Sequence, residues 1–396
     1  MNTPKDSLSL KLLLPLLASI VAVSPLSIDI YLPAMPLLAK VFNTDMPAVQ
    51  NSLSVYLLGY ALGLAVFGPL ADKYSKRTLV FIGLGGFTLM SLCLPIVSSI
   101  NEFIVVRFFQ AFISSAATVV VPGTIRNIYK EHSAKGLSYV SMIMMIAPMI
   151  APSIGSLLLL HSWQLMFYVL ATYSTLILCL TYRYFPSDTQ APTKISVGSI
   201  ERYKIVFLCK KARLYILTSM FISFAFFTYI TAIPFIYLSV FSTSEVTFSL
   251  LFGVNIIGLM LAHFINTRCI VRYGSRKMLA LGLIVAVIFS SLLLLATVFQ
   301  LSIVFTVITI LPLMGSISII AVNSDALILN ALAKQSGTAT AVIGILRFGI
   351  GALAGPLLAI SYDGSALPFA FIMWSAVIFV LFCQFIVVHQ LKQQQS

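Results

Sequence analysis

The chain has 396 residues, of which 60% are hydrophobic and 9% are charged, and its formal net charge is +13. Soluble domains carry about 25% charged residues, so this composition excludes a soluble globular enzyme, a disordered chain and a disulfide-stapled secreted domain. The apolar runs are long and continuous, unlike the alternating segments of about 10 residues that build an outer-membrane barrel. We therefore expect an all-α integral membrane protein.

Twelve apolar segments are each long enough to cross a hydrocarbon core of about 30 Å, which takes roughly 20 helical residues. The first six are 11–33, 50–70, 78–98, 101–124, 136–159 and 162–182. The last six are 214–240, 245–265, 278–298, 301–324, 337–360 and 366–389. The first segment is too long, and too closely followed by a second, to be a cleaved signal peptide.

The positive charge is distributed unevenly between the two sides of these spans. Of the 24 lysines and arginines, all but Lys40, Arg107 and Arg347 fall at the termini or in connections on one side. Positively charged connections stay in the cytoplasm, so both termini are expected there, in a protein of the bacterial inner membrane. We interpret the charge as a topological signal and expect no nucleic-acid partner.

A polar stretch in the middle of the chain separates six spans from six. Residues 73–77 align with 272–276 at an offset of 199 (272 − 73), and Gly59 aligns with Gly258 at the same offset. Such a repeat predicts two pseudo-symmetric six-helix halves. The expected domains are an N-terminal half, 1–183, a cytoplasmic linker, 184–213, and a C-terminal half, 214–396.

Four patches of sequence resemble motifs of a known transporter family. The connection 68–77 is similar to the loop after span two in the major facilitator superfamily, with Ser75 where a glycine is usual. Residues 107–111 resemble a motif of its proton-coupled members, and residues 147–155 resemble its antiporter motif. The string 28–36 resembles the bicyclomycin/chloramphenicol-resistance (Bcr/CflA) exporter branch.

The resemblance implies the twelve-helix fold of that superfamily and a drug:proton antiporter. The chain departs from the branch at two places. Arg126-Asn127 stands where an Arg-Asp pair is usual, and Arg347 within span eleven is not typical of the branch. In the family that Asp helps to hold basic residues of the loop after span two, so Lys76 and Arg77 are expected to have another partner here.

Asp29 lies within the first expected span, where a carboxylate costs about 2.5–3.5 kcal/mol on insertion scales. Pro25, Pro33 and Pro36 are near it and leave backbone carbonyls without helical partners. Broken membrane helices are tolerated where they line a cavity. We therefore expect Asp29 to load and unload a proton. The alternative is a structural carboxylate that pairs with a cation on another helix.

Arg107 is a permanently charged residue within span four. The resemblance implies that this arginine influences the protonation of Asp29. A static salt bridge between the two residues is the alternative. Gln110 is one turn farther along the same helix face and is a candidate for hydrogen bonding to a substrate.

Residues near the inner ends of the spans are candidates for a gate. Arg126 and Asp325 are also 199 positions apart (325 − 126) and occupy equivalent places in the two halves. A pair between them would close the cytoplasmic side, and separate local partners are the alternative. The resemblance further implies gating roles for the loop residues Asp72, Lys73, Lys76 and Arg77.

On span five, Pro148, Pro152 and Gly155 share one smooth helix face. Small and ring-shaped side chains of this kind allow close helix contact. We expect this face to pack closely against a neighbouring helix and to seal the protein against proton leakage.

Substrate contact is expected from polar and aromatic side chains within the spans, although any one aromatic residue can instead face lipid or pack. Tyr56 and Tyr60 share a helix face. The candidates are Tyr31, Tyr60, Gln110, Tyr229, Asn255, Asn323 and Arg347.

The leading hypothesis is a proton-coupled secondary exporter, or antiporter, of small amphipathic drugs that works by alternating access. The alternative is a dedicated exporter of an endogenous metabolite such as a siderophore, because several arginines would make the cavity positive. The 5 cysteines and 4 histidines are scattered singly, and no nucleotide-binding loop is present. Neither an enzyme nor a metal or other cofactor is expected. The expected partners are a small-molecule substrate, protons and the lipid bilayer, with the protein a monomer.

Overall fold

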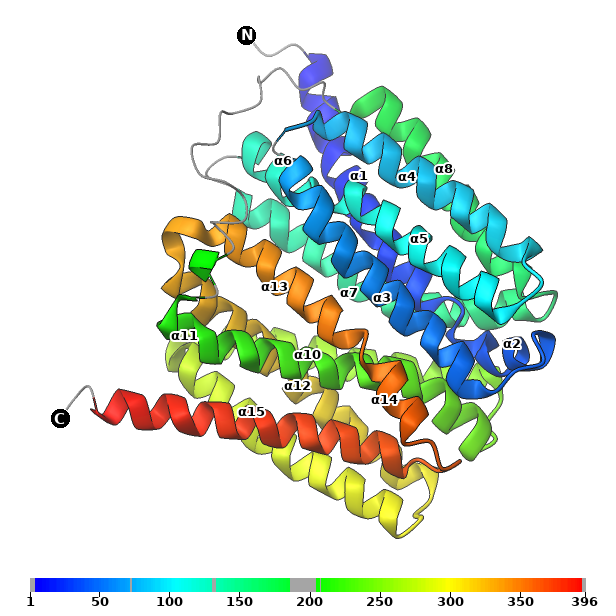
Figure 1. The fold of residues 1–396 in the computed structure, drawn as a ribbon. Coiled ribbons are helices and arrows are strands. Elements are labelled where there is room, and N and C mark those ends of the chain that lie inside the picture. Colours follow the sequence, from blue (N-terminus) through cyan, green and yellow to red (C-terminus); the bar gives the residue numbers. More distant parts are fainter. Residues whose placement is uncertain (1–3, 72, 130–132, 186–203, 207, 394–396) are drawn as a thin grey trace. The chain divides into compact units, whose positions relative to one another are not determined.

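Figure 1 shows a computed structural model of the chain. The structure describes residues 4–71, 73–129, 133–185, 204–206 and 208–393, and the regular elements within these ranges are helices. The chain divides into two compact units, Met1–Ile195 and Ser196–Ser396. The limits of the expected linker, 184–213, remain a prediction.

The helices of each unit follow one another in chain order. The first unit contains α1 (Pro4–Asp29), α2 (Met35–Val41), α3 (Met46–Leu70), α4 (Lys76–Cys93), α5 (Ile100–Thr118), α6 (Val121–Tyr129), α7 (Ser133–Leu159) and α8 (Gln164–Tyr184). The second contains α10 (Lys210–Pro234), α11 (Glu245–Val298), α12 (Ile303–Ala331), α13 (Ser336–Gly351), α14 (Ala354–Ile360) and α15 (Leu367–Gln393). Short 3-10 segments are η1 (Leu32–Ala34), η2 (Leu94–Ile96) and η5 (Ala333–Gln335), and η4 (Phe235–Val240) is a π-helix.

Twelve membrane spans account for these helices. Among the described residues, 10 helical segments are long and apolar enough to cross a membrane. One of them, α11, has 54 residues and provides two crossings, and α7 provides one more. The all-α fold with twelve spans in two six-helix halves is therefore confirmed.

The first expected span, 11–33, is broken near its C-terminal end and extends farther than expected. α1 stops at Asp29, η1 forms a short 3-10 turn, and α2 carries the apolar stretch on to Val41. Pro33 explains the break, because it has no N–H to bond the carbonyl of Asp29. Pro25 lies within α1 without ending it.

Two other expected spans are interrupted as well. The segment 101–124 is divided between α5 and α6 by a turn at residues 119–120. The segment 337–360 is divided between α13 and α14 by a turn at residues 352–353. The sequence pattern did not predict either turn, because the residues at both turns, Val119-Val120 and Ala352-Leu353, are apolar.

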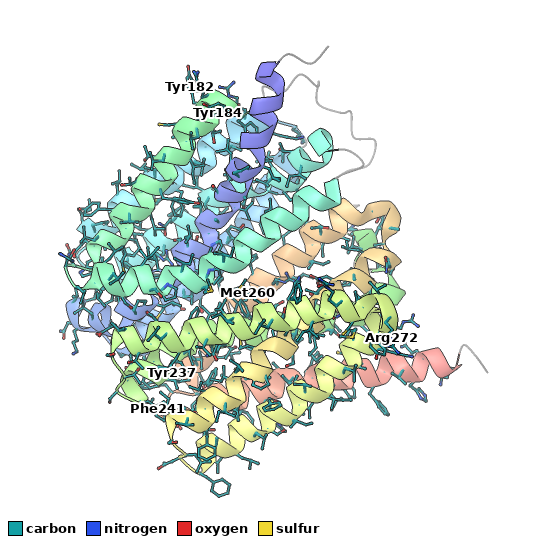
Figure 2. The ribbon with its side chains drawn as sticks, turned by 180° about the vertical axis from the view of Figure 1, so that it is seen from behind. Tyr182, Tyr184, Tyr237, Phe241, Met260 and Arg272 are labelled. Atoms are coloured by element: carbon teal, nitrogen blue, oxygen red, sulfur yellow. The ribbon has the colours of Figure 1, made fainter. Side chains whose placement is uncertain are left out.

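The connection between spans eight and nine, residues 266–277, is helical except at one position. The non-helical residue within α11 is Gly274, with φ 76° and ψ 158°, a conformation that residues with a Cβ rarely adopt. Ser75, at the equivalent position of the first half, has φ −56°, which any residue can adopt. The first connection therefore accepts a serine where the family usually has glycine. Figure 2 labels Arg272, just before the kink in α11.

The two units contain the same close helix pair. In the first, α3 runs beside α5 (Figure 1), and a Cβ at Gly59 would overlap the carbonyl oxygen of Phe108. In the second, α11 packs on α12, where Gly258 lies against Leu311 and Gly315 against Ala262. Small residues let membrane helices approach closely. The faint repeat in the sequence thus corresponds to equivalent packing of span two on span four and of span eight on span ten.

We expect Gly59→Ala to destabilise the protein by about 1–3 kcal/mol, the usual effect of overpacking, because its methyl group would overlap the Phe108 carbonyl. Gly85→Ala is the matched control, since Gly85 also lies within a helix and has open space where a Cβ would be. Thermal unfolding of the purified protein in detergent measures both variants. Equal melting temperatures would contradict the close contact between α3 and α5.

Candidate functional site

Asp29 is the last residue of α1 and is only 1% exposed. Its Oδ1 atom has no hydrogen-bond partner, and within the described ranges no cation forms an ion pair with it. A buried carboxylate without compensating partners is strongly destabilised while it is charged. Binding a proton removes that charge, so the position suits a group that alternates between two protonation states.

Arg107, in α5, is fully buried and bonds the residue two positions before Asp29. Its guanidinium donates to Ser27 Oγ (2.8 Å), to the Ser27 carbonyl oxygen (3.1 Å) and to Gln110 Oε1 (2.7 Å). Residues two apart in an α-helix are separated by about 200° around its axis, so Ser27 and Asp29 lie on opposite sides of α1. For this reason no ion pair joins Arg107 to Asp29 in the part of the chain that the structure describes.

Two tyrosine rings enclose the Arg107 guanidinium. Its Cζ atom is 4.4 Å from the ring centroid of Tyr31 and 4.2 Å from that of Tyr56. The Tyr31 hydroxyl is hydrogen-bonded to Ser52 (3.2 Å), and the Tyr56 hydroxyl donates to Ser24 (3.3 Å). Desolvated cation–π contacts contribute about 2 kcal/mol each. The charge of Arg107 is therefore stabilised by ring faces and neutral acceptors, without a carboxylate.

Gln110 and Tyr60 belong to the same buried polar network. Gln110 accepts from Arg107, and its Nε2 donates to Ser91 Oγ in α4 (2.8 Å). The Tyr60 hydroxyl is 2.8 Å from Thr118 Oγ1 in α5. Both side chains thus link helices within the first unit. Their contact with a substrate remains a prediction.

Ser27 is not among the site residues that the sequence singles out. Serines in membrane helices often bond their own backbone, so nothing in the sequence distinguishes Ser27 from the others. Tyr56 was noted only for the helix face that it shares with Tyr60, and its contact with Arg107 was not predicted.

In the second unit, Asn255 of α11 lies against two tyrosines. Its Nδ2 donates to the hydroxyl of Tyr229 (3.0 Å) and to that of Tyr237 (3.3 Å), which is labelled in Figure 2. Asn255 is fully buried, and its Oδ1 has no hydrogen-bond partner among the residues that the structure describes. Tyr229 stacks on Phe252 with 5.8 Å between ring centroids. The structure therefore brings the candidates Tyr229 and Asn255 together.

Asn323 of α12 forms an amide contact between two helices. Its Nδ2 donates to Asn266 Oδ1 in α11 (2.8 Å) and to the Ile319 carbonyl oxygen (2.8 Å). Side-chain amides in membrane proteins commonly form such links between helices. Substrate binding by Asn323 stays a prediction.

Arg347 forms an ion pair with Asp325, with 2.6 Å between Nη2 and Oδ2. Nε of Arg347 donates to Ser223 Oγ (3.0 Å), and Ser219 Oγ donates to Asp325 Oδ1 (2.7 Å). Helices α13, α12 and α10 meet at this cluster. The expected pair of Asp325 with Arg126 remains a prediction, because the Arg126 side chain lies outside the described residues. The carboxylate does have a local partner, which was the alternative.

Arg77 contacts the end of α8. Its Nη2 donates to the Tyr182 carbonyl oxygen (2.7 Å), and its Cζ is 5.7 Å from the centroid of the Tyr182 ring. Cations are stabilised beside the last carbonyls of a helix, so this is the other partner expected for Arg77. Lys73 is exposed and Lys76 is half-buried. Asp72 lies outside the described residues, and gating by this loop remains a prediction.

The face of α7 with Pro148, Pro152 and Gly155 includes a close contact with the broken first span. A Cβ at Gly155 would overlap the carbonyl oxygen of Ile30, and the ring of Pro33 is the next neighbour. Gly155 therefore lets α7 approach the backbone just beyond Asp29. A seal against proton leakage at this face stays a prediction.

We expect Arg107→Lys to destabilise the protein by about 1.5–3 kcal/mol, the usual contribution of a hydrogen bond to a charged group. A lysine cannot reproduce the planar guanidinium that bonds Ser27 and Gln110 while lying between two rings. Arg272→Lys makes the same chemical change at an exposed position and is expected to stay within about 0.5 kcal/mol. Thermal unfolding compares the two variants. Equal destabilisation by both substitutions would refute the requirement for a guanidinium at position 107.

The family model of the Major Facilitator Superfamily matches residues 17–356 of the chain. The chain is 26% identical over 401 residues to the bicyclomycin resistance protein homolog of Haemophilus influenzae, with 100% of both chains covered. It is 26% identical over 280 residues to the chloramphenicol resistance protein of Pseudomonas aeruginosa, covering 68% of this chain and 66% of the relative.

Among solved structures, the fold is similar to that of the xylose transporter XylE from E. coli, with a TM-score of 0.72. The likeness covers 93% of this chain and 94% of that one at 13% identity, and it shows the fold alone. The resistance proteins among the relatives agree with the resemblance to the Bcr/CflA branch. With its twelve spans, the chain belongs to the Major Facilitator Superfamily and is a multi-span membrane transport protein rather than an enzyme.

Proposed function

We propose that this protein is a proton-coupled exporter of small amphipathic molecules, toxic drugs among them, across the bacterial inner membrane. Membership of the superfamily supports transport, and relatives named for bicyclomycin and chloramphenicol resistance support export. The distribution of lysines and arginines supports cytoplasmic termini. Transport proceeds by alternating access, in which the substrate site opens to one side of the membrane at a time.

The observation that carries the proton coupling is the carboxylate of Asp29. It is buried, lies at a break in the first span, and has an oxygen without a hydrogen-bond partner in the part of the chain that the structure describes. Ionised carboxylates within membrane spans are rare, and they mark proton relays in transporters. Asp29 therefore takes up a proton while the protein is open to the outside and releases it while the protein is open to the cytoplasm.

Arg107 supports this cycle as a fixed charge. It is held by Ser27, Gln110 and two tyrosine rings and stays positive throughout. Its positive charge helps to expel the proton from Asp29 by repulsion. Each elementary charge that crosses the membrane gains about 2.3 kcal/mol per 100 mV of membrane potential, which drives the substrate outward.

A dedicated exporter of an anionic metabolite, such as a siderophore, is the second candidate. It is favoured by the presence of Arg347 within a membrane span in addition to Arg107. The two candidates share the same fold and proton coupling and differ only in cargo.

Inverted membrane vesicles test both candidates. With the vesicle lumen acidified, bicyclomycin, chloramphenicol and a carboxylate siderophore are added in turn, and a fluorescent dye reports substrate-dependent loss of the pH gradient. We expect the wild-type protein to dissipate the gradient and Asp29→Asn to abolish the response, because an amide cannot carry the proton. A response to the siderophore alone would select the second candidate.

Two controls keep this result interpretable. Asp45→Asn makes the same chemical change at an exposed helix cap, where Asp45 accepts a hydrogen bond from the Ala48 N–H (3.0 Å). Because asparagine caps a helix equally well, the gradient dissipation by this variant should equal that of the wild type. Substrate counterflow without a pH gradient should persist in Asp29→Asn. Full gradient dissipation by Asp29→Asn would remove Asp29 from the proton pathway.

A further inference from the structure

The second unit contains a receptor for a carboxylate, formed by Arg347, Ser219 and Ser223. The carboxylate of Asp325 occupies it. One carboxylate oxygen of Asp325 accepts from Arg347 Nη2 (2.6 Å), and the other accepts from Ser219 Oγ (2.7 Å). Ser223 Oγ accepts from Arg347 Nε (3.0 Å) and fixes the guanidinium in place. The carboxylate comes from α12, whereas the groups that bind it come from α13 and α10.

Asp325 occupies this receptor incompletely. Only Nη2 of Arg347 bonds the carboxylate, and Nη1 makes no hydrogen bond within the described residues. Guanidinium binds carboxylate most strongly through two parallel N–H···O bonds. A carboxylate that is free to choose its orientation can engage both terminal nitrogens, so it can compete with the single bond from Asp325.

The cluster is also accessible, in contrast to Arg107. The side chains of Arg347 and Asp325 are 31% and 26% exposed, whereas Arg107 is 0% exposed. Two helical turns along α10 from Ser219, the Phe227 ring packs on Phe348 with 5.4 Å between centroids. This ring contact packs α10 on α13 beside the carboxylate receptor, and Phe227 itself is buried.

We propose that Arg347, with Ser219 and Ser223, binds a carboxylate group of the transported molecule, and that Asp325 fills this receptor while no substrate is bound. The inference rests on the proposed function, because it assumes a small-molecule cargo. It adds to the proposed cargo a class of amphipathic compounds that carry a carboxylate beside an apolar body. Arg347 is then a substrate-binding residue, and Asp325 is an internal competitor.

Benzoate and benzamide are the probes, because they have the same shape and differ in charge. Binding to the purified full-length protein in detergent is measured by calorimetry. We expect Asp325→Asn to bind benzoate at least tenfold more tightly than the wild type, because the competitor is removed, with no gain for benzamide. Arg347→Gln should lose benzoate binding. Asp363→Asn removes an equal charge from an exposed turn and should match the wild type.

An unchanged benzoate affinity in Asp325→Asn, or an equal gain for benzamide, would overturn the proposal. If Arg347→Gln does not fold, Ser223→Ala replaces it, and a several-fold weaker affinity for benzoate is expected. Benzoate binding should persist in Asp29→Asn, which separates this inference from proton coupling. If the wild-type protein exports drugs but Asp325→Asn gains no affinity for benzoate, only the carboxylate site is rejected, and the proposed function stands.

Discussion

A charge within a membrane-spanning helix has lost its water and must be compensated by the protein around it. This chain meets the constraint in three different ways. Arg107 is enclosed by two tyrosine rings and neutral acceptors, and Arg347 is paired with a carboxylate. Asp29 is left with an oxygen that no donor among the described residues reaches. The uncompensated group is the one at the helix break, where the proposed cycle needs a change in protonation.

The two units share a framework but not their polar chemistry. The close pairs formed by α3 with α5 and by α11 with α12 use glycines at equivalent positions, Gly59 and Gly258. One turn before these glycines, Tyr56 lies over a guanidinium in the first unit, and Asn255 bonds two tyrosine hydroxyls in the second. Backbone contacts between helices therefore repeat along the chain, while the side chains that face the polar interior have diverged.

Hydropathy and charge were enough to predict the spans and the two halves, because the bilayer imposes one length scale and one polarity rule on every helix. They were not enough to predict where a span is interrupted. Pro33 breaks the first span whereas Pro25 does not, and the turn that divides α13 from α14 has no polar residue to mark it. Such breaks depend on how the neighbouring helices pack, and a single sequence does not show that packing.

The candidate site was predicted in its charged members but not in the serines that bond them. Asp29, Arg107 and Arg347 stand out because charges are rare in apolar spans. The serines at positions 27, 219 and 223 do not, because hydroxyls are common there and gain meaning only when another helix brings a guanidinium to them. Arg107 bonds Ser27 instead of Asp29 because Ser27 lies on the face of α1 that meets α5. The sequence alone does not show which face that is.

Among the described residues Arg107 has no carboxylate partner, and this has an electrical consequence for the proposed cycle of Asp29. While Asp29 is ionised, its charge and that of Arg107 sum to zero, and the pair has no net response to the transmembrane voltage. Once Asp29 binds a proton, Arg107 remains alone and the same region carries a full positive charge in a medium of low dielectric constant. The proton-loaded form is therefore the electrophoretic one. A voltage that is negative inside acts on that form and leaves the empty form to relax without electrical work.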